Sequence, residues 1–258
     1  MKAALATASV DVSDLFVSAG NTELIAGVSF SVAAGESVAI VGESGSGKSL
    51  TLKSIAGILP AGVRITSGSA GVGGRAALIP QEPLSALDPL MPVGKQITEI
   101  CRYVAGLDRK RASARTRELL EQVGLGYLQA RTAAYPHQLS GGERQRALIA
   151  MALASNPDVL LCDEPTTALD VTVAAQVLGL IERLQRDLGL TILFVSHDIA
   201  VVSHVCSRIL VMRAGVVVED APTGQLVDHP AHPYTKQLLS AVLEVPELGP
   251  RHEEGTTL

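Results

Sequence analysis

The sequence predicts an α/β fold in which a mostly parallel β-sheet is covered by helices on both faces. Three observations support this prediction. Residues 37–41, 159–162 and 190–195 are apolar at nearly every position, as strands buried on both faces are. Segments with helical periodicity, such as residues 171–188, alternate with these strands. A glycine-rich segment, residues 42–49, joins the first strand directly to a helix.

Length and composition limit the class of protein. The chain has 258 residues, enough for one large domain or for a core with a subdomain. Its net charge of −5 argues against a nucleic-acid-binding surface, so we interpret the basic run at residues 109–117 as a solvated helix face. The longest apolar run, residues 147–154, is far below the roughly 18 residues that cross a bilayer, and residues 1–14 lack the apolar core of a secretory signal. The isolated cysteines, which suit a reducing compartment, are Cys101, Cys162 and Cys206.

The remaining elements are expected in the following order. Strands are predicted at residues 10–17, 28–32 and 76–79, with a connection of small residues at 68–74. The helix after the glycine-rich segment is expected at residues 50–56. From residue 93 to about residue 155 the pattern is helical, and the sheet then resumes.

The glycine-rich segment, called the glycine loop below (residues 42–49), has the composition of a phosphate-binding loop. Gly42, Gly45 and Gly47 let successive backbone N–H groups turn inward at a helix N-terminus. Lys48 would add a mobile positive charge, and the Ser49 hydroxyl would bind Mg²⁺. A flexible linker is the alternative, but a linker would not lie between a buried strand and a helix. The predicted nucleotide-binding residues are Gly42, Glu43, Ser44, Gly45, Ser46, Gly47, Lys48, Ser49 and Leu50.

Two acidic residues follow the strand at residues 159–162. Asp163 can reach Mg²⁺ through a water, while Glu164 faces the position of the terminal phosphate and can activate water. An Asp-Glu pair after a strand is commonplace by itself. The glycine loop upstream makes the catalytic interpretation the stronger one.

A second anion site is predicted where a long helix begins with Ser140 as its N-cap. Gly141 and Gly142 leave the first backbone N–H groups uncovered. An ordinary capped helix would also explain Ser140. Because the chain has one glycine loop, the second site is interpreted as completing the nucleotide site of another subunit.

Several ordered motifs make residues 10–243 resemble the ABC-transporter ATPase family. The glycine loop is similar to the family's Walker A motif, residues 160–164 to its Walker B motif and residues 139–146 to its signature motif. Single residues that match are the Q-loop glutamine Gln81, the D-loop aspartate Asp170 and the switch histidine His197. A lone histidine after an apolar strand is usually structural. His197 is interpreted as the switch histidine because it follows the Walker B motif at the spacing found in the family.

The resemblance implies a P-loop NTPase core with a RecA-like, mostly parallel sheet, a small antiparallel β region and an inserted helical subdomain. The implied domains are an ATP-binding core at residues 1–90 and 157–222, a helical subdomain at 91–156, and a C-terminal helix and tail at 223–258. ATP and Mg²⁺ are the implied cofactors. The implied catalytic residues are Glu164, His197, Gln81 and Asp170, the implied metal ligands are Ser49, Gln81 and Asp163, and the residues that cover the ATP of a second subunit are Ser140, Gly141 and Gly142.

A narrower resemblance is to the peptide/nickel importer branch, carried by residues 81–89, 135–138, 163–172 and 229–235. It implies a peripheral subunit at the cytoplasmic face of the membrane, paired with a second ATPase beneath two permeases and supplied by an extracytoplasmic binding protein. Peptides, nickel and metal chelates all remain possible substrates. The alternative interpretation of the last segment, a metal site at its histidines, is disfavoured by the interleaved prolines.

Two departures from the family pattern are visible. The stretch from Gly68 to Gln81 is shorter than in the family, which usually has an extra antiparallel strand there, so we expect a trimmed β region. Ala19 stands where an adenine-stacking aromatic is expected, with Phe16 as the nearest aromatic. Nucleotide affinity is therefore expected to rest on the phosphates and Mg²⁺.

Two other classes of protein share some of these features but fit the sequence less well. A small GTPase would need a base-reading motif ending in an acid, and residues 235–238 lack the acid. A soluble ABC-type ATPase that is not coupled to transport usually carries two cassettes or a long coiled coil, and neither fits in 258 residues.

Overall fold

The structure is a computed structural model that describes residues 8–129 and 134–243. Its centre is a six-stranded sheet with strand order β5-β6-β7-β3-β8-β9, in which only β9 is antiparallel to its neighbour. The prediction of an α/β fold with a mostly parallel sheet is therefore confirmed. The strands are β3 (Ser37–Val41), β5 (Ala76–Ile79), β6 (Val159–Asp163), β7 (Thr191–Ser196), β8 (Arg208–Arg213) and β9 (Val216–Pro222).

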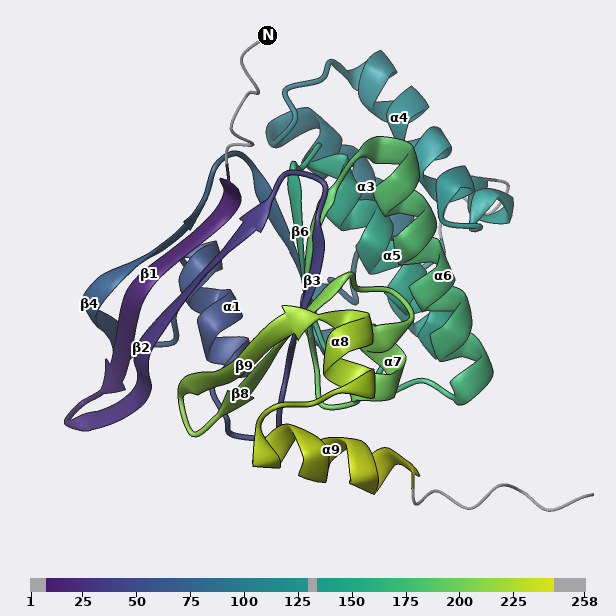
Figure 1. The fold of residues 1–258 in the computed structure, drawn as a ribbon. Helices are drawn as coiled ribbons and strands as arrows, with labels where there is room; N and C mark the ends of the chain where they lie inside the picture. Colours follow the sequence, from purple (N-terminus) through teal and green to yellow (C-terminus); the bar gives the residue numbers. More distant parts are fainter. Residues whose placement is uncertain (1–7, 130–133, 244–258) are drawn as a thin grey trace, which may run out of the picture.

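The central strands are apolar at nearly every position and contribute to two hydrophobic cores. On β3, Val38 and Ile40 pack into the core that contains α1 (Lys48–Ala56), while Ala39 and Val41 pack into the core that contains the other helices. Successive side chains of a strand point to opposite faces, so one short strand contributes to both cores. Figure 1 shows α1 enclosed between the six-stranded sheet and a second, antiparallel sheet.

The antiparallel sheet has the order β2-β1-β4, with β1 at Ala8–Ala19, β2 at Thr22–Ala33 and β4 at Val63–Val72. The prediction that residues 68–74 are a connection was wrong, because residues up to Val72 pair with β1. Glycine has low strand propensity, but backbone pairing with β1 overrides it. Residues 73–75 link β4 directly to β5, and this described stretch holds no further strand.

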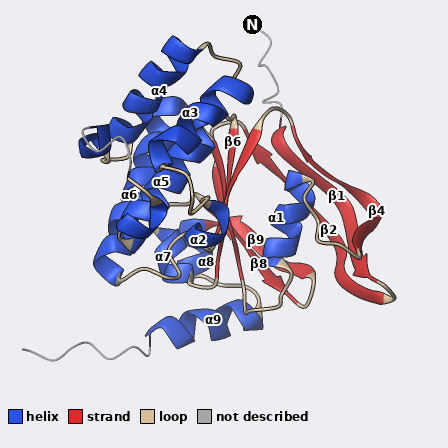
Figure 2. Cartoon of the chain, turned by 180° about the vertical axis from the view of Figure 1, so that it is seen from behind, coloured by secondary structure: helices blue, strands red, loops and turns tan. Residues whose placement is uncertain are grey.

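Helices fill the chain between β5 and β6 and cover one face of the six-stranded sheet (Figure 2). Their hydrophobic side chains share one core with the sheet, since Ile97 and Leu119 belong to the same cluster as Leu160. The division into a core and a helical subdomain stays a prediction. The helices between β5 and β6 are α2 (Pro83–Ala86), α3 (Val93–Tyr103), α4 (Arg109–Gln122), the 3-10 turns η1 (Gly126–Gln129) and η2 (Pro136–Gln138), and α5 (Gly141–Ala154).

The last part of the chain adds α6 (Val171–Leu188), α7 (Ile199–Ser203), α8 (Thr223–Asp228) and α9 (Pro233–Leu243). In both views α9 lies at the end of the sheet where β3 leads into α1 (Figures 1 and 2). Within the two described ranges every helix is too short or too polar to span a bilayer.

The basic run on α4 lies on a solvated helix face, as predicted. Arg109 and Lys110 are exposed, Arg111 pairs with Asp108 at 3.4 Å, and Arg115 pairs with Glu118 at 3.2 Å. Exposed ion pairs of this kind contribute little to stability. The three cysteines are buried and free, as their isolated positions in the sequence suggest.

Replacement of Gly68 by alanine should destabilise the protein by about 1–3 kcal/mol. Gly68 has φ 75°, and a Cβ atom there would lie 2.0 Å from the Asp14 carbonyl oxygen. Gly71→Ala is the matched control, since nothing lies within 4 Å of a Cβ at that position. The measurement is the urea midpoint of each variant. Equal midpoints would show that residue 68 lies in an unstrained connection and that the pairing of β4 with β1 does not constrain it.

Candidate functional site

The glycine loop connects the carboxyl end of β3 to the first turn of α1. Gly42 has φ 155°, and a Cβ atom at this position would lie 2.1 Å from the Met212 carbonyl oxygen. Gly47 is the N-cap of α1 and has φ 103°. Because Met212 lies on β8, a side chain at residue 42 would push the loop away from that strand. Glycine allows the loop to lie against the sheet, with the backbone N–H groups at the start of α1 uncovered.

Lys48 is a buried residue near the end of the glycine loop. Its side chain is 4% exposed, and its Nζ donates hydrogen bonds to the Gly42 carbonyl at 2.8 Å and to the Glu43 carbonyl at 2.9 Å. Burial lowers the pKa of the Lys48 amine, and the nearby carboxylates of Glu164 and Asp163 oppose that effect. The Lys48 ammonium group is thus a buried positive charge that contacts two loop carbonyls and lies near two acidic side chains.

Ser49 and Asp163 meet from different elements. The Ser49 hydroxyl at the start of α1 donates a hydrogen bond of 2.6 Å to Asp163 Oδ1 at the end of β6. Both are hard oxygen donors of the kind that Mg²⁺ prefers. Among the described residues no group of three or more His, Cys, Asp or Glu side chains could hold a metal. These residues therefore fit a Mg²⁺ ion only as a partial ligand set, which phosphate oxygens and water would complete.

Three of the four predicted catalytic side chains, those of Glu164, His197 and Gln81, meet at Glu164, whereas Asp170 lies outside the group. Glu164 Oε2 lies 3.0 Å from His197 Nδ1 and 3.5 Å from Gln81 Nε2, and it accepts a hydrogen bond of 2.8 Å from the Thr167 hydroxyl. The side chain is only 14% exposed, against 55% for His197. Gln81, which was also expected among the metal ligands, points its amide nitrogen at Glu164.

The backbone of Glu164 is itself unusual. Its φ is 46°, a left-handed conformation that L-residues other than glycine seldom adopt. Its N–H donates a hydrogen bond of 3.0 Å to the Val195 carbonyl on β7. Strained backbone is often found at functional sites, where the surrounding structure enforces it.

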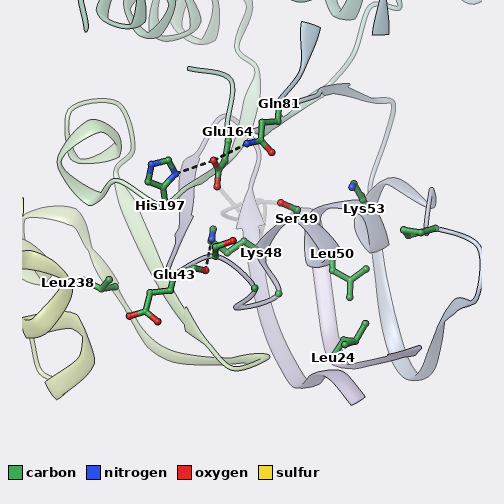
Figure 3. A pocket seen from close by; sticks show the side chains of 14 residues that line it. Leu24, Glu43, Lys48, Ser49, Leu50, Lys53, Gln81, Glu164, His197 and Leu238 are labelled. Carbon is green, nitrogen blue, oxygen red and sulfur yellow. Dashed lines mark hydrogen bonds and ion pairs between the residues drawn. The ribbon is translucent and has the colours of Figure 1, made fainter. Parts of the chain in front are cut away.

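A cleft of about 830 Å³, called the loop cleft below, joins these groups (Figure 3). It brings the glycine loop, Gln81, Glu164 and His197 together. Neither Ala19 nor Phe16 lines it; the apolar wall is aliphatic. The lining residues are Leu24, Glu43, Ser44, Gly45, Gly47, Lys48, Ser49, Leu50, Lys53, Pro60, Gln81, Glu164, His197 and Leu238.

Several residues of this site were not predicted. Thr167 carries no chemical signal by itself, since a threonine in a turn is common. Leu24, Pro60 and Leu238 come from three separate parts of the chain, and only the tertiary fold brings them to the cleft. No pattern in the sequence could have identified them.

The predicted second anion site lies outside the loop cleft. Ser140 caps α5 through a capping box, in which its N–H donates to Glu143 Oε2 at 2.7 Å and its Oγ accepts from the Glu143 N–H at 3.3 Å. A Cβ atom on Gly142 would lie 2.4 Å from Val173 Cγ1 on α6, so this glycine also permits close helix packing. Asp170 caps α6 by accepting from the Val173 N–H at 3.0 Å. The structure therefore groups the signature residues with Asp170 at the starts of α5 and α6.

Comparison with known proteins identifies the family. A family model described as ABC transporter matches residues 25–167. The oligopeptide transport ATP-binding protein AppD of Bacillus subtilis is 43% identical over 84% of this chain and 71% of its own length. The chain belongs to the ABC transporter family. The resemblance inferred from the motifs is thus confirmed, and this ABC ATPase binds and hydrolyses ATP.

Other relatives agree with this assignment. The glutathione import ATP-binding protein GsiA of Pectobacterium atrosepticum is 43% identical over 88% of this chain and 40% of its own length. Among solved structures, cbiO1 of Clostridium perfringens, part of the ABC transporter complex cbiONQ, superposes with a TM-score of 0.77 at 25% identity over 93% of this chain and 96% of its own. A dimer of the ATP-binding cassette MJ0796 bound to ADP and Pi has a TM-score of 0.70 at 27% identity, covering 83% of this chain and 98% of its own.

The buried Lys48 amine should make the nucleotide-free protein more stable as the pH rises toward 10.5, its ordinary pKa. Between the lowered pKa and that value the unfolded chain binds more protons than the folded protein, so the free energy of unfolding increases with pH. We expect the urea midpoint of the wild type to rise relative to that of Lys48→Met as the pH approaches 10.5 from below. Lys110→Met, which removes an exposed amine, is the control and should follow the wild type. Parallel curves for wild type and Lys48→Met would contradict the burial argument.

Proposed function

We propose that this ABC ATPase powers the import of peptides or related small solutes as one of two ATPase subunits beneath two membrane permeases. The convergence of His197, Gln81 and Thr167 on Glu164, beside the glycine loop, carries the catalytic part of this proposal. The transport part is supported by the relatives, which are named for the transport or import of oligopeptides, glutathione and peptides. Nickel and metal chelates belong to the related branch and are a less supported substrate class.

In the proposed mechanism the glycine loop holds the phosphates of ATP. Backbone N–H groups at the start of α1 and the Lys48 amine contact the phosphate oxygens. Ser49 and Asp163 would hold a Mg²⁺ ion, which neutralises phosphate charge when bound. The aliphatic side of the cleft, including Leu24 and Pro60, is left for the base. None of the described residues that line the cleft is Phe, Tyr or Trp, so contacts to the phosphates dominate the affinity.

Glu164 acts on the attacking water. Thr167, His197 and Gln81 all contact Oε2, which orients the carboxylate and leaves Oε1 to accept a proton from water. His197 therefore acts on Glu164, and we expect it also to contact the terminal phosphate, as the family resemblance implies for the switch histidine. Because little covalent chemistry is required of the protein in phosphoryl transfer, catalysis rests mainly on positioning of this kind and on stabilisation of the phosphate charge.

The second half of each site comes from another chain. Ser140, Gly141 and Gly142 lie away from the cleft of their own subunit and would cover the ATP held by the partner, with Asp170 between the two sites. The partner is a second copy or a closely similar ATPase. An extracytoplasmic binding protein delivers the solute, and this subunit lies at the cytoplasmic face of the membrane.

Glu164→Gln should leave ATP binding within about twofold of the wild type and lower turnover by 10²-fold or more, since the amide keeps the shape but cannot accept a proton from water. Turnover is measured by phosphate release in the complex with the permeases, and binding by titration with ATP. Glu118→Gln makes the same chemical change on an exposed face of α4 and should have wild-type activity. Near-normal hydrolysis by Glu164→Gln would remove this residue from the mechanism.

The isolated chain should hydrolyse ATP slowly, with a specific activity that rises with protein concentration, because each site needs two subunits. Addition of the cognate ATPase, the permeases and a peptide-loaded binding protein should raise the rate further. Titration of the purified chain over about two decades of concentration tests the first statement. A fast rate that is independent of concentration would contradict the shared site, and a complex that no peptide stimulates would contradict the import assignment.

A further inference from the structure

The segment His232-Pro233-Tyr234-Thr235 contacts the glycine loop, although the proposed mechanism makes no use of it. Tyr234 lies in the first turn of α9 and is 2% exposed. Its hydroxyl accepts a hydrogen bond of 3.0 Å from the backbone N–H of Glu43, inside the loop. These two residues are 191 positions apart in the sequence. A backbone group of the loop is therefore held by the C-terminal helix.

The start of α9 is firmly held against the sheet. Glu219 on β9 accepts hydrogen bonds from the Ala231 N–H at 2.8 Å, the His232 N–H at 2.9 Å and the Thr235 hydroxyl at 2.5 Å. Burial raises the pKa of Glu219, but these hydrogen bonds outweigh it and the net pKa lies below its ordinary value. The carboxylate thus stays charged at neutral pH and keeps the helix start in place.

The hairpin of β8 and β9 supports the same contact from a second direction. The Arg213 guanidinium at the end of β8 lies 4.8 Å from the centre of the Tyr234 ring. Two residues later, the Gly215 N–H donates a hydrogen bond of 3.0 Å to the Ser46 carbonyl in the loop. The ring and the hairpin therefore hold the loop at both Glu43 and Ser46.

The same helix also reaches the loop cleft. Leu238 follows Tyr234 by four positions, so both side chains lie on one face of α9. Leu238 lines the loop cleft together with Glu43 (Figure 3). One face of α9 thus contacts the backbone of the loop with Tyr234 and the cleft with Leu238.

We propose that Tyr234 is a positioning residue for the glycine loop, and that α9 responds to the nucleotide bound there. The proposal rests on the proposed function, in which this loop holds the ATP phosphates. A loop tied at Glu43 spends more time in the binding-competent conformation, and apparent affinity scales with that fraction. By linkage, a nucleotide that stabilises this conformation also stabilises the contact with α9.

Tyr234→Phe in the full chain tests the proposal, because it removes the hydroxyl and keeps the ring beneath Arg213. Loss of one hydrogen bond is expected to weaken ADP binding by about two- to tenfold in calorimetric titration. Tyr103→Phe, at an exposed position on α3, is the matched control and should bind ADP as the wild type does. A purely structural role for Tyr234 would lower the melting temperature but leave the affinity of the folded protein unchanged.

Hydrogen exchange supplies a second readout, and its measurement on the wild type does not depend on whether the variant folds. ADP should slow amide exchange in residues 233–240 of the wild type, and this protection should be smaller in Tyr234→Phe. Wild-type α9 that exchanges equally with and without bound ADP would overturn the proposal, as would a folded variant with wild-type affinity and protection. A wild type that binds no ADP at all would instead contradict the proposed function, so the two failures are distinguishable.

Discussion

The approach of the glycine loop to the Met212 carbonyl determines where the chemistry of this protein is placed. Residue 42 must be glycine because its Cβ atom would lie 2.1 Å from that oxygen. β3 and β8 are neighbours in the sheet, so the loop that leaves β3 rests on the end of β8. Ligands of open α/β sheets bind at the carboxyl ends of the strands, and this contact places the loop at that edge.

The arrangement of the acids follows from the same sheet order. β6 and β7 are adjacent, with Asp163 opposite Val195, so the residues after each strand emerge side by side. Glu164 and His197 therefore meet although they are 33 positions apart in the sequence. The left-handed backbone at Glu164 turns its carboxylate toward the loop cleft, while the preceding residue, Asp163, points to Ser49. The two adjacent acids thus contact different parts of the site: Asp163 contacts Ser49, and Glu164 contacts His197.

The sequence predicted those parts of the fold and site that depend on local pattern. Buried strands that are apolar at nearly every position, and a glycine loop between a strand and a helix, are local signals. β4 escaped prediction because its Gly and Ser residues form a strand only through pairing with β1. Leu24 and Leu238 escaped because long-range packing brings them to the cleft. The sequence analysis singled out residues 229–235, which contain Tyr234, but it could not show that Tyr234 bonds to Glu43. The two residues are 191 positions apart, and only the folded chain brings them together.

The position of the signature residues explains why one chain would form only half of a catalytic site. Ser140 and Gly142 lie at the start of α5, and Asp170 caps α6. Val173 links the two helix starts, because its N–H donates to the Asp170 carboxylate and its side chain packs against Gly142. This packing joins the two motifs, whose residues Ser140, Gly141 and Asp170 form an exposed surface and do not line the loop cleft of the same chain. Under the proposed function a partner ATPase presents this surface to the cleft as one unit. Closure of the two chains would then bring Ser140 and Asp170 to the bound nucleotide together, and hydrolysis would depend on the contact between the subunits.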